Sequence, residues 1–205
     1  MADTEDPNPE RLLERARAGN RSALGQLLER YRGYLALLAR VQIGRRLQSK
    51  LDAADLIQET FLEAHRTFGS FRGTTLAELA AWLRRLLASN LALAVRRFQG
   101  TRGRDVRLEQ ALEDNLDESS RLLDRGLAAP GSTPSQQAAR REEAVLLAAA
   151  LERLPDDYRE VLILRHLEGL TFPETARRMG RTLDSVEKLW ARALPRLRRL
   201  LGGTS

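Results

Sequence analysis

The chain has 205 residues, a net charge of +6 and no cysteine. The missing cysteines exclude disulfide frameworks and thiolate metal sites, and the two histidines, His65 and His166, are far apart. No apolar run approaches the roughly 20 residues that span a bilayer, and the acidic start MADTEDPNPE is no signal peptide. We therefore expect a protein of the reducing cytoplasm, with one large core or two small ones.

From Pro9 to Phe98 the chain is rich in leucine, alanine and arginine and poor in strand formers, which predicts helices. We expect breaks at Gly19–Asn20, at Gly44 and from Gly69 to Thr75. Nothing in the chain reads as a strand.

The segment 52–73 reads DAADLIQETFLEAHRTFGSFRG. One helix face is apolar, and the other carries Asp55, Gln58, Glu59, Leu62 and Glu63. This polar face has two readings. A di-metal site would need Glu-x-x-His pairs on facing helices, and none is present, so a solvated or partner-binding face is favoured. We expect no metal, no cofactor and no catalytic residue.

A glycine-containing loop and a second helix, from about Leu76 to Phe98, follow. Their combination of basic residues with Phe71 and Trp82 suits single-stranded DNA, although both aromatics are somewhat better read as core anchors. Asn90 suits either a base edge or a hydrogen bond between helices. The residues predicted to bind DNA here are Arg72, Gly73, Thr74, Arg84, Arg85, Asn90, Arg96 and Arg97.

Charge is unevenly distributed after this helix. Seven acids and two arginines between Asp105 and Asp124 give that strip a net charge of −5, which leaves +11 for the rest of the chain. Residues 127–137 then combine proline, glycine and serine, typical of an extended link. The pattern predicts helical domains at 9–99 and 138–201, joined by a flexible linker at 100–137. Whether the stretch from Val106 to Leu127 folds into a helix stays open.

The final segment predicts a helix opened by Pro155 and then a helix-turn-helix. Ala176 suits a close helix crossing, Gly180 a left-handed helix end, and Thr182 the cap of the next helix. An apolar stripe from Val186 to Leu201 would face the core, and at Pro195 we expect a bend or a fresh start. The residues predicted to meet a major groove are Arg181, Thr182, Asp184, Ser185, Glu187, Lys188 and Arg192.

Taken together, these motifs resemble the bacterial RNA polymerase sigma factors of the extracytoplasmic-function (ECF) group. The resemblance rests on DLIQETFLEA, FRG, AWLRRLLASNLA, LPDDYREVLILRHLEGLTFPETARRMG and SVEKLWARAL in this order. It implies an all-α fold with conserved regions 2 and 4, and a non-enzymatic specificity subunit. Its implied partners are core RNA polymerase and promoter DNA, and it allows an anti-sigma factor.

The resemblance also assigns roles to residues. Asp55, Gln58, Glu59 and Leu62 would dock on a coiled coil of the polymerase. The loop at Arg72 and the following helix would open the promoter at minus ten, and the helix from Thr182 would read the minus-thirty-five element. The acidic connector would lie in the RNA exit path. Glu187 and Leu189 depart from the usual basic pattern, so the sequence read at minus thirty-five is not predicted.

Two other functions stay open from the residues alone. The first is a dimeric helix-turn-helix regulator that acts without polymerase and binds palindromic DNA. The second is a metal-dependent hydrolase built on the helix of Asp55. Neither explains the arginine-rich helix together with the FRG loop.

Overall fold

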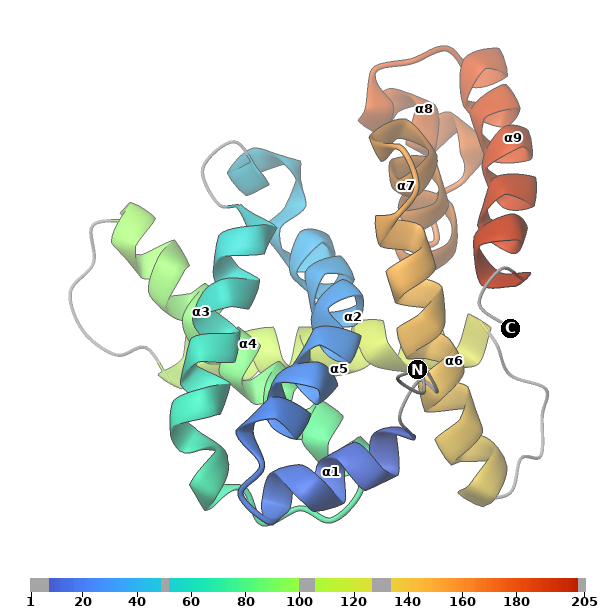
Figure 1. Ribbon diagram of the computed structural model, residues 1–205. Helices are drawn as coiled ribbons and strands as arrows, with labels where there is room; N and C mark the ends of the chain where they lie inside the picture. The colour runs from blue at the N-terminus through green and yellow to red at the C-terminus, as the bar shows by residue number, and fades with distance from the viewer. Residues whose placement is uncertain (1–7, 49–51, 100–105, 127–133, 203–205) are drawn as a thin grey trace.

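In the computed structural model, residues 8–48, 52–99, 106–126 and 134–202 are described, and within these ranges the chain forms helices and turns but no strand (Figure 1). The all-α expectation is confirmed for this part of the chain. None of the described helices combines the length and apolar character needed to cross a bilayer.

The amino-terminal set consists of α1 (Pro9–Arg17), α2 (Arg21–Gln48), α3 (Ala53–Thr67), a 3-10 turn (Phe68–Ser70) and α4 (Leu76–Gln99). Gly19, at φ +92°, separates α1 from α2 as predicted. The predicted break at Gly44 is wrong, because α2 continues through it to Gln48. A glycine inside a helix costs about 1 kcal/mol, and tertiary packing of neighbours such as the buried Ile43 outweighs that cost.

The core of this set is built from leucines at helical spacing. Leu83, Leu87 and Leu91 recur every four residues along α4 and are at most 1% exposed. Helix α4 contacts α2 and α3, whose Leu35 and Ile57 are buried to the same degree in the same core. Burying one such side chain contributes roughly 1.5–3 kcal/mol, so this three-helix core fixes the positions of α3 and α4.

The acidic strip folds into a helix, α5 (Val106–Gly126), which settles the question that its sequence left open. Leu116 and Leu123, seven residues apart, are both buried, so α5 docks by one apolar side. It lies against α4 and α2. Asp105 and residues 127–133 of the predicted link lie outside the described residues.

Helix α6 (Pro134–Glu152) lies alongside α2 and joins the two halves of the molecule (Figure 1). The helices approach so closely that a Cβ on Gly33 would come within 2.7 Å of the Ala149 Cα. Two ion pairs flank this contact, Arg30 with Glu142 and Arg40 with Glu152, the latter at 3.1 Å.

The carboxy-terminal set contains α7 (Asp156–Leu162), one π-helical turn (Ile163–Leu167), α8 (Phe172–Met179) and α9 (Leu183–Gly202). Pro155 caps α7, as predicted, with two aspartates in its first turn. Helix α9 continues through Pro195 without a fresh start. Ala193 is fully buried before the proline and Leu197 packs on the core after it, which offsets the lost hydrogen bond.

Candidate functional site

The helix-turn-helix formed by α8 and α9 has the geometry that its sequence predicts. Ala176 is 6% exposed at the helix crossing, and Gly180 ends α8 in the left-handed conformation at φ +64°. The Arg181 N–H donates to the Ala176 carbonyl at 3.0 Å, which closes the turn. Thr182 then caps α9, because its hydroxyl accepts from the Ser185 N–H at 3.3 Å.

A capping box that the sequence analysis missed fixes the start of α8. The Glu174 carboxylate accepts from the Thr171 N–H at 2.8 Å and from its hydroxyl at 2.7 Å. These hydrogen bonds hold the pKa of Glu174 below its ordinary value. The signal was present in the sequence, since Thr171 and Glu174 stand in the T-x-x-E spacing of this motif.

The predicted recognition face of α9 is open to solvent. Arg181, Thr182, Asp184, Glu187, Lys188 and Arg192 are exposed and Ser185 is half-buried. Two of the cations already have partners: Lys188 contacts Asp184 one turn away at 2.7 Å, and Arg181 contacts Asp157 of α7 at 2.6 Å. Exposed pairs of this kind are worth 0 to about 1 kcal/mol, so a phosphate can replace them.

A ring cluster on the far side of the recognition face holds α9 in place. The Trp190 Nε1–H donates to His166 Nε2 at 3.1 Å, and the Phe172 ring meets Trp190 edge-on at 5.5 Å. The Arg165 guanidinium lies 4.2 Å above the Phe172 ring centroid. Burial, and then the charge of Arg165, lower the pKa of His166, which favours the neutral ring that accepts this bond. Nothing in the sequence pointed to this pairing.

The loop between α3 and α4 is built on three aromatic rings. Phe71 lies 5.6 Å from Phe68 and 5.2 Å from Trp82, centroid to centroid. All three pack on the core, which favours the anchoring role for Phe71 and Trp82. Gly73 is required here, because a Cβ at this position would come within 2.3 Å of the Phe71 ring.

The basic end of this loop is ordered by one carboxylate. Glu78 accepts from the backbone N–H groups of Thr74 and Thr75 at 2.8 and 3.0 Å, which lowers its pKa. Arg72 and Thr74 are exposed. Beside them a hollow of about 500 Å³ is lined by Arg17, Arg21, His65, Phe68, Phe71 and Arg72, among others. It combines cationic rims with aromatic walls.

The residues that α4 was predicted to offer to DNA do not share one open surface. The side chains of Arg85 and Arg97 are 59% and 65% exposed, but those of Arg84 and Arg96 are only 13% and 11% exposed. Asn90 makes the second of its two predicted contacts, donating to Glu63 of α3 at 3.0 Å.

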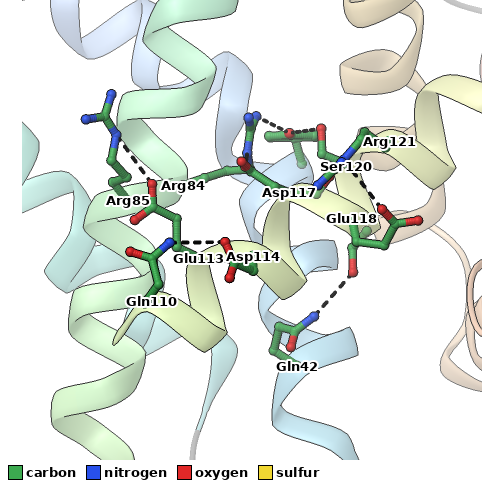
Figure 2. A network of polar contacts seen from close by, with 12 residues as sticks. Gln42, Arg84, Arg85, Gln110, Glu113, Asp114, Asp117, Glu118, Ser120 and Arg121 are labelled. Atoms are coloured by element: carbon green, nitrogen blue, oxygen red, sulfur yellow. Dashed lines mark hydrogen bonds and ion pairs between the residues drawn. The ribbon is translucent and has the colours of Figure 1, made fainter. Parts of the chain in front are cut away.

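Helix α5 covers Arg84 and Arg96, and its carboxylates meet α4 in antiparallel order. Figure 2 shows the part of this contact around Arg84, Arg85, Glu113 and Asp117. Arg84 donates to Asp117 at 2.5 Å, Arg85 lies 3.7 Å from Glu113, and Arg96 lies 3.5 Å from Glu109. Burial lowers the pKa of the Arg84 guanidinium, but Tyr34 and Asp117 raise it above its ordinary value. Arg84 is therefore a charged group held between helices.

Tyr34 of α2 completes this network, and the sequence analysis missed it. Its hydroxyl accepts from Arg84 at 2.9 Å and donates to Ser120 of α5 at 2.8 Å. Figure 2 shows this chain of contacts beside Gln42, which bonds Ser119 at 3.2 Å. A tyrosine inside a leucine-rich helix was the available signal, because a buried tyrosine hydroxyl needs a partner.

The polar face of α3 is open. Asp55, Gln58 and Glu59 are exposed, and Leu62 is 60% exposed beside them. The Glu59 carboxylate forms a long ion pair with Arg97, with Oε1 and Nη1 4.0 Å apart. Asp52 caps the helix by accepting from the Ala54 N–H at 2.8 Å. Within the described ranges there is no group of three or more metal-ligating side chains.

Comparison with known families decides what this arrangement is. Residues 27–102 match the family model "Sigma-70 region 2", and residues 144–197 match "Sigma-70, region 4". The chain is 30% identical over 184 residues to the ECF RNA polymerase sigma-E factor of Haemophilus influenzae, covering 89% of both chains. It is 31% identical over 185 residues to the ECF sigma factor SigM of Mycobacterium tuberculosis, covering 90% of this chain and 80% of SigM.

The chain belongs to the ECF family of RNA polymerase sigma factors. The resemblance seen in the sequence is thereby confirmed, and so are the two helical regions with a linker. As a sigma factor the protein directs promoter recognition and transcription initiation. The dimeric regulator is not favoured, because a region 2 accompanies the helix-turn-helix.

Among solved structures, the chain aligns with a chain of the RsbN–BldN complex at 25% identity. The alignment covers 92% of this chain and 98% of that one, with a TM-score of 0.33. A TM-score this low lends no support to a shared arrangement of the helices.

Proposed function

We propose that this ECF sigma factor uses three separate surfaces: α3 for core polymerase, the loop at Arg72 with α4 for the minus-ten strand, and α9 for the minus-thirty-five element. One observation supports this division above all. The exposed polar face of α3, the ordered basic loop and the open face of α9 lie on different elements, in the chain order of the two sigma regions.

The α3 surface, formed by Asp55, Gln58, Glu59 and Leu62, suits a protein partner. Its carboxylates would repel DNA phosphates, and a leucine exposed beside them loses water contact when a partner covers it. We assign this surface to the polymerase.

The loop surface suits single-stranded DNA. Arg72 and Thr74 are exposed on a backbone that Glu78 holds in place, next to the hollow with aromatic walls and arginine rims. Such a site can hold an unstacked base while the arginines contact phosphates. Arg85 and Arg97 add exposed positive charge along α4, and Arg84 and Arg96 would join them only where α5 no longer covers them. Gly73 belongs to the site because it allows the loop to fold against Phe71.

Promoter opening on this proposal uses binding energy alone, so the protein is an initiation factor and not an enzyme, and it works with RNA polymerase in the cytoplasm. Core RNA polymerase and promoter DNA are its partners. We propose an anti-sigma factor only as a regulator, a partner that membership of the ECF family allows.

Reconstitution tests the proposed function. The purified chain should bind core polymerase and direct it to a defined set of start sites across the genome of its host. Start positions should share two upstream elements, at minus thirty-five and minus ten. Polymerase that initiates at the same sites with and without the chain would contradict the proposal.

The recognition face allows a sharper prediction. Arg192→Ala should weaken binding of the holoenzyme to the upstream element and lower the slope of log K against log salt by about one unit, because one phosphate contact is lost. The matched control is Arg153→Ala, which removes another exposed arginine, before α7. Fluorescence anisotropy at several salt concentrations measures both. Equal slopes for the two variants would show that Arg192 makes no phosphate contact and does not belong to the site.

A further inference from the structure

The arginines of α4 serve two partners that cannot be bound at the same time. On the proposed function they contact the minus-ten strand, yet in this structure three of the four, Arg84, Arg85 and Arg96, contact the acidic helix α5, and Arg97 pairs with Glu59 of α3. We propose that α5 is a built-in competitor of promoter DNA, which masks the minus-ten surface of the free protein until α5 is displaced. This inference rests on the proposed function of α4.

The pairs between the helices follow an antiparallel order. Residue numbers rise along α4 while they fall along α5, in the pairs Arg84 with Asp117, Arg85 with Glu113 and Arg96 with Glu109. Glu109, Glu113 and Asp117 are four residues apart, so their carboxylates follow one face of α5 at steps of about 6 Å. A regular row of negative charge is also what a nucleic-acid backbone offers to arginines.

The most deeply held contact is at Arg84. Its side chain is 13% exposed, and it donates to Asp117 and to Tyr34, whose hydroxyl in turn donates to Ser120 of α5. Most of this side chain is therefore covered while α5 is in place.

Helix α5 is held by more than charge. Leu116 and Leu123 are buried, and α6 contacts α5 while it also lies along α2 at Gly33. Displacing α5 therefore breaks apolar packing as well as ion pairs, which makes masking a distinct closed state and not a loose attraction.

Of the three proposed surfaces only the minus-ten surface is masked, and it is masked at Arg84 and Arg96 of α4 while Arg72 and Thr74 of the loop stay exposed. The polar face of α3 and the recognition face of α9 stay exposed in the closed state. Core polymerase can therefore dock on α3 before α5 is displaced, which confines full minus-ten binding to the assembled enzyme.

A matched pair of variants tests the proposal. Glu113→Gln with Asp117→Asn removes two carboxylates that face α4. Asp114→Asn with Glu118→Gln removes two from the same helix that contact Gln110 and Arg121 of α5 itself. Both double variants change the net charge by the same amount. The probe is a fluorescein-labelled, mixed-sequence single-stranded oligonucleotide of about 16 nucleotides, bound to the free full-length chain.

We expect the first double variant to bind the oligonucleotide about tenfold more tightly than the unchanged chain, and the second less than about twofold more tightly. A tenfold gain corresponds to a closed state populated about ten to one. Equal gains in oligonucleotide affinity for both variants would mean that the loss of negative charge alone strengthens binding. No gain for either variant would mean that α5 does not mask the surface. Each result overturns the proposal. Far-ultraviolet circular dichroism checks that both variants keep their helices.

A second pair of variants acts without changing charge. Gly33→Ala places a methyl group against the Ala149 backbone and should push α6 away from α2, whereas Gly25→Ala in the same helix meets nothing within 4 Å. Both changes raise helix propensity, so α2 itself should stay folded. Tighter oligonucleotide binding by Gly33→Ala alone supports masking, and identical binding by the two variants contradicts it.

Failure of this inference can be told apart from failure of the proposed function. If the unchanged chain directs polymerase to promoters but the matched variants bind alike, only the masking by α5 is wrong. If the chain directs no initiation, the proposed function is wrong as well.

Discussion

Replacing Asp55 and Glu59 by lysine is expected to abolish co-purification of the sigma factor with core RNA polymerase. Both carboxylates are exposed on one face of α3, one helical turn apart, and the reversal changes the charge of that face by four units. Like charges placed across a docking surface cost several kcal/mol, which removes a micromolar or weaker complex and strongly reduces a tighter one. Pull-down on immobilised core enzyme measures the loss.

The matched control is Glu10→Lys with Glu14→Lys, which reverses two exposed charges at the same spacing on α1. This control should bind polymerase as the unchanged chain does. Circular dichroism should show unchanged helicity for both double variants, because the apolar side of α3, with Leu56 and Ile57, is untouched. Retained polymerase binding by the α3 variant would refute the assignment of this surface.

The helix-turn-helix could be predicted from sequence because its determinants are local. Gly180, Thr182 and Ala176 each act within a few residues, through a left-handed turn, a cap and a close crossing. The loop after α3 was placed for the same reason. Local rules also produced the error at Gly44, where glycine propensity was read as a break and long-range packing kept the helix intact.

The ion pairs between α4 and α5 could not be predicted, because they join segments that are distant in the sequence. The acidic strip was visible as a charge pattern, but its net charge does not say which cations it meets. Arg84 and Asp117 are 33 residues apart, and Tyr34 is 86 residues from Ser120. Antiparallel complementarity between the α4 arginines and the α5 acids was a signal present in the sequence that the sequence analysis did not use.

Asn90 shows how tertiary contacts decide between two roles that the chemistry of the side chain allows equally. An amide suits a base edge and a helix contact alike, and the nearness of Glu63 and Thr60 on α3 decides its partners in this structure. Arg84 and Arg96 illustrate the same point for charge, since their exposed neighbours Arg85 and Arg97 are the same residue type on the same helix.

Substituting Ala176 by leucine is expected to destabilise region 4 by about 1–3 kcal/mol. The alanine is 6% exposed on α8, which contacts α9, and the fully buried Val186 of α9 belongs to the same core, so three extra carbons must push the helices apart. For a chain of this size that corresponds to about 2–4 °C in melting temperature for each kcal/mol. Thermal unfolding followed by circular dichroism measures the shift.

Ala191→Leu is the matched control, because it makes the same substitution at an exposed position of α9 and should change stability by no more than about 0.5 kcal/mol. The Ala176 variant should also lose affinity for the upstream element while it still co-purifies with core polymerase, since α3 belongs to the other region. DNA affinity and polymerase binding should respond differently, because a displaced α8 changes the angle at which α9 enters the groove. It leaves the leucine core of α2, α3 and α4 intact. An unaltered melting temperature would show that the crossing tolerates a larger side chain. In that case the close approach of α8 and α9 does not position the recognition face.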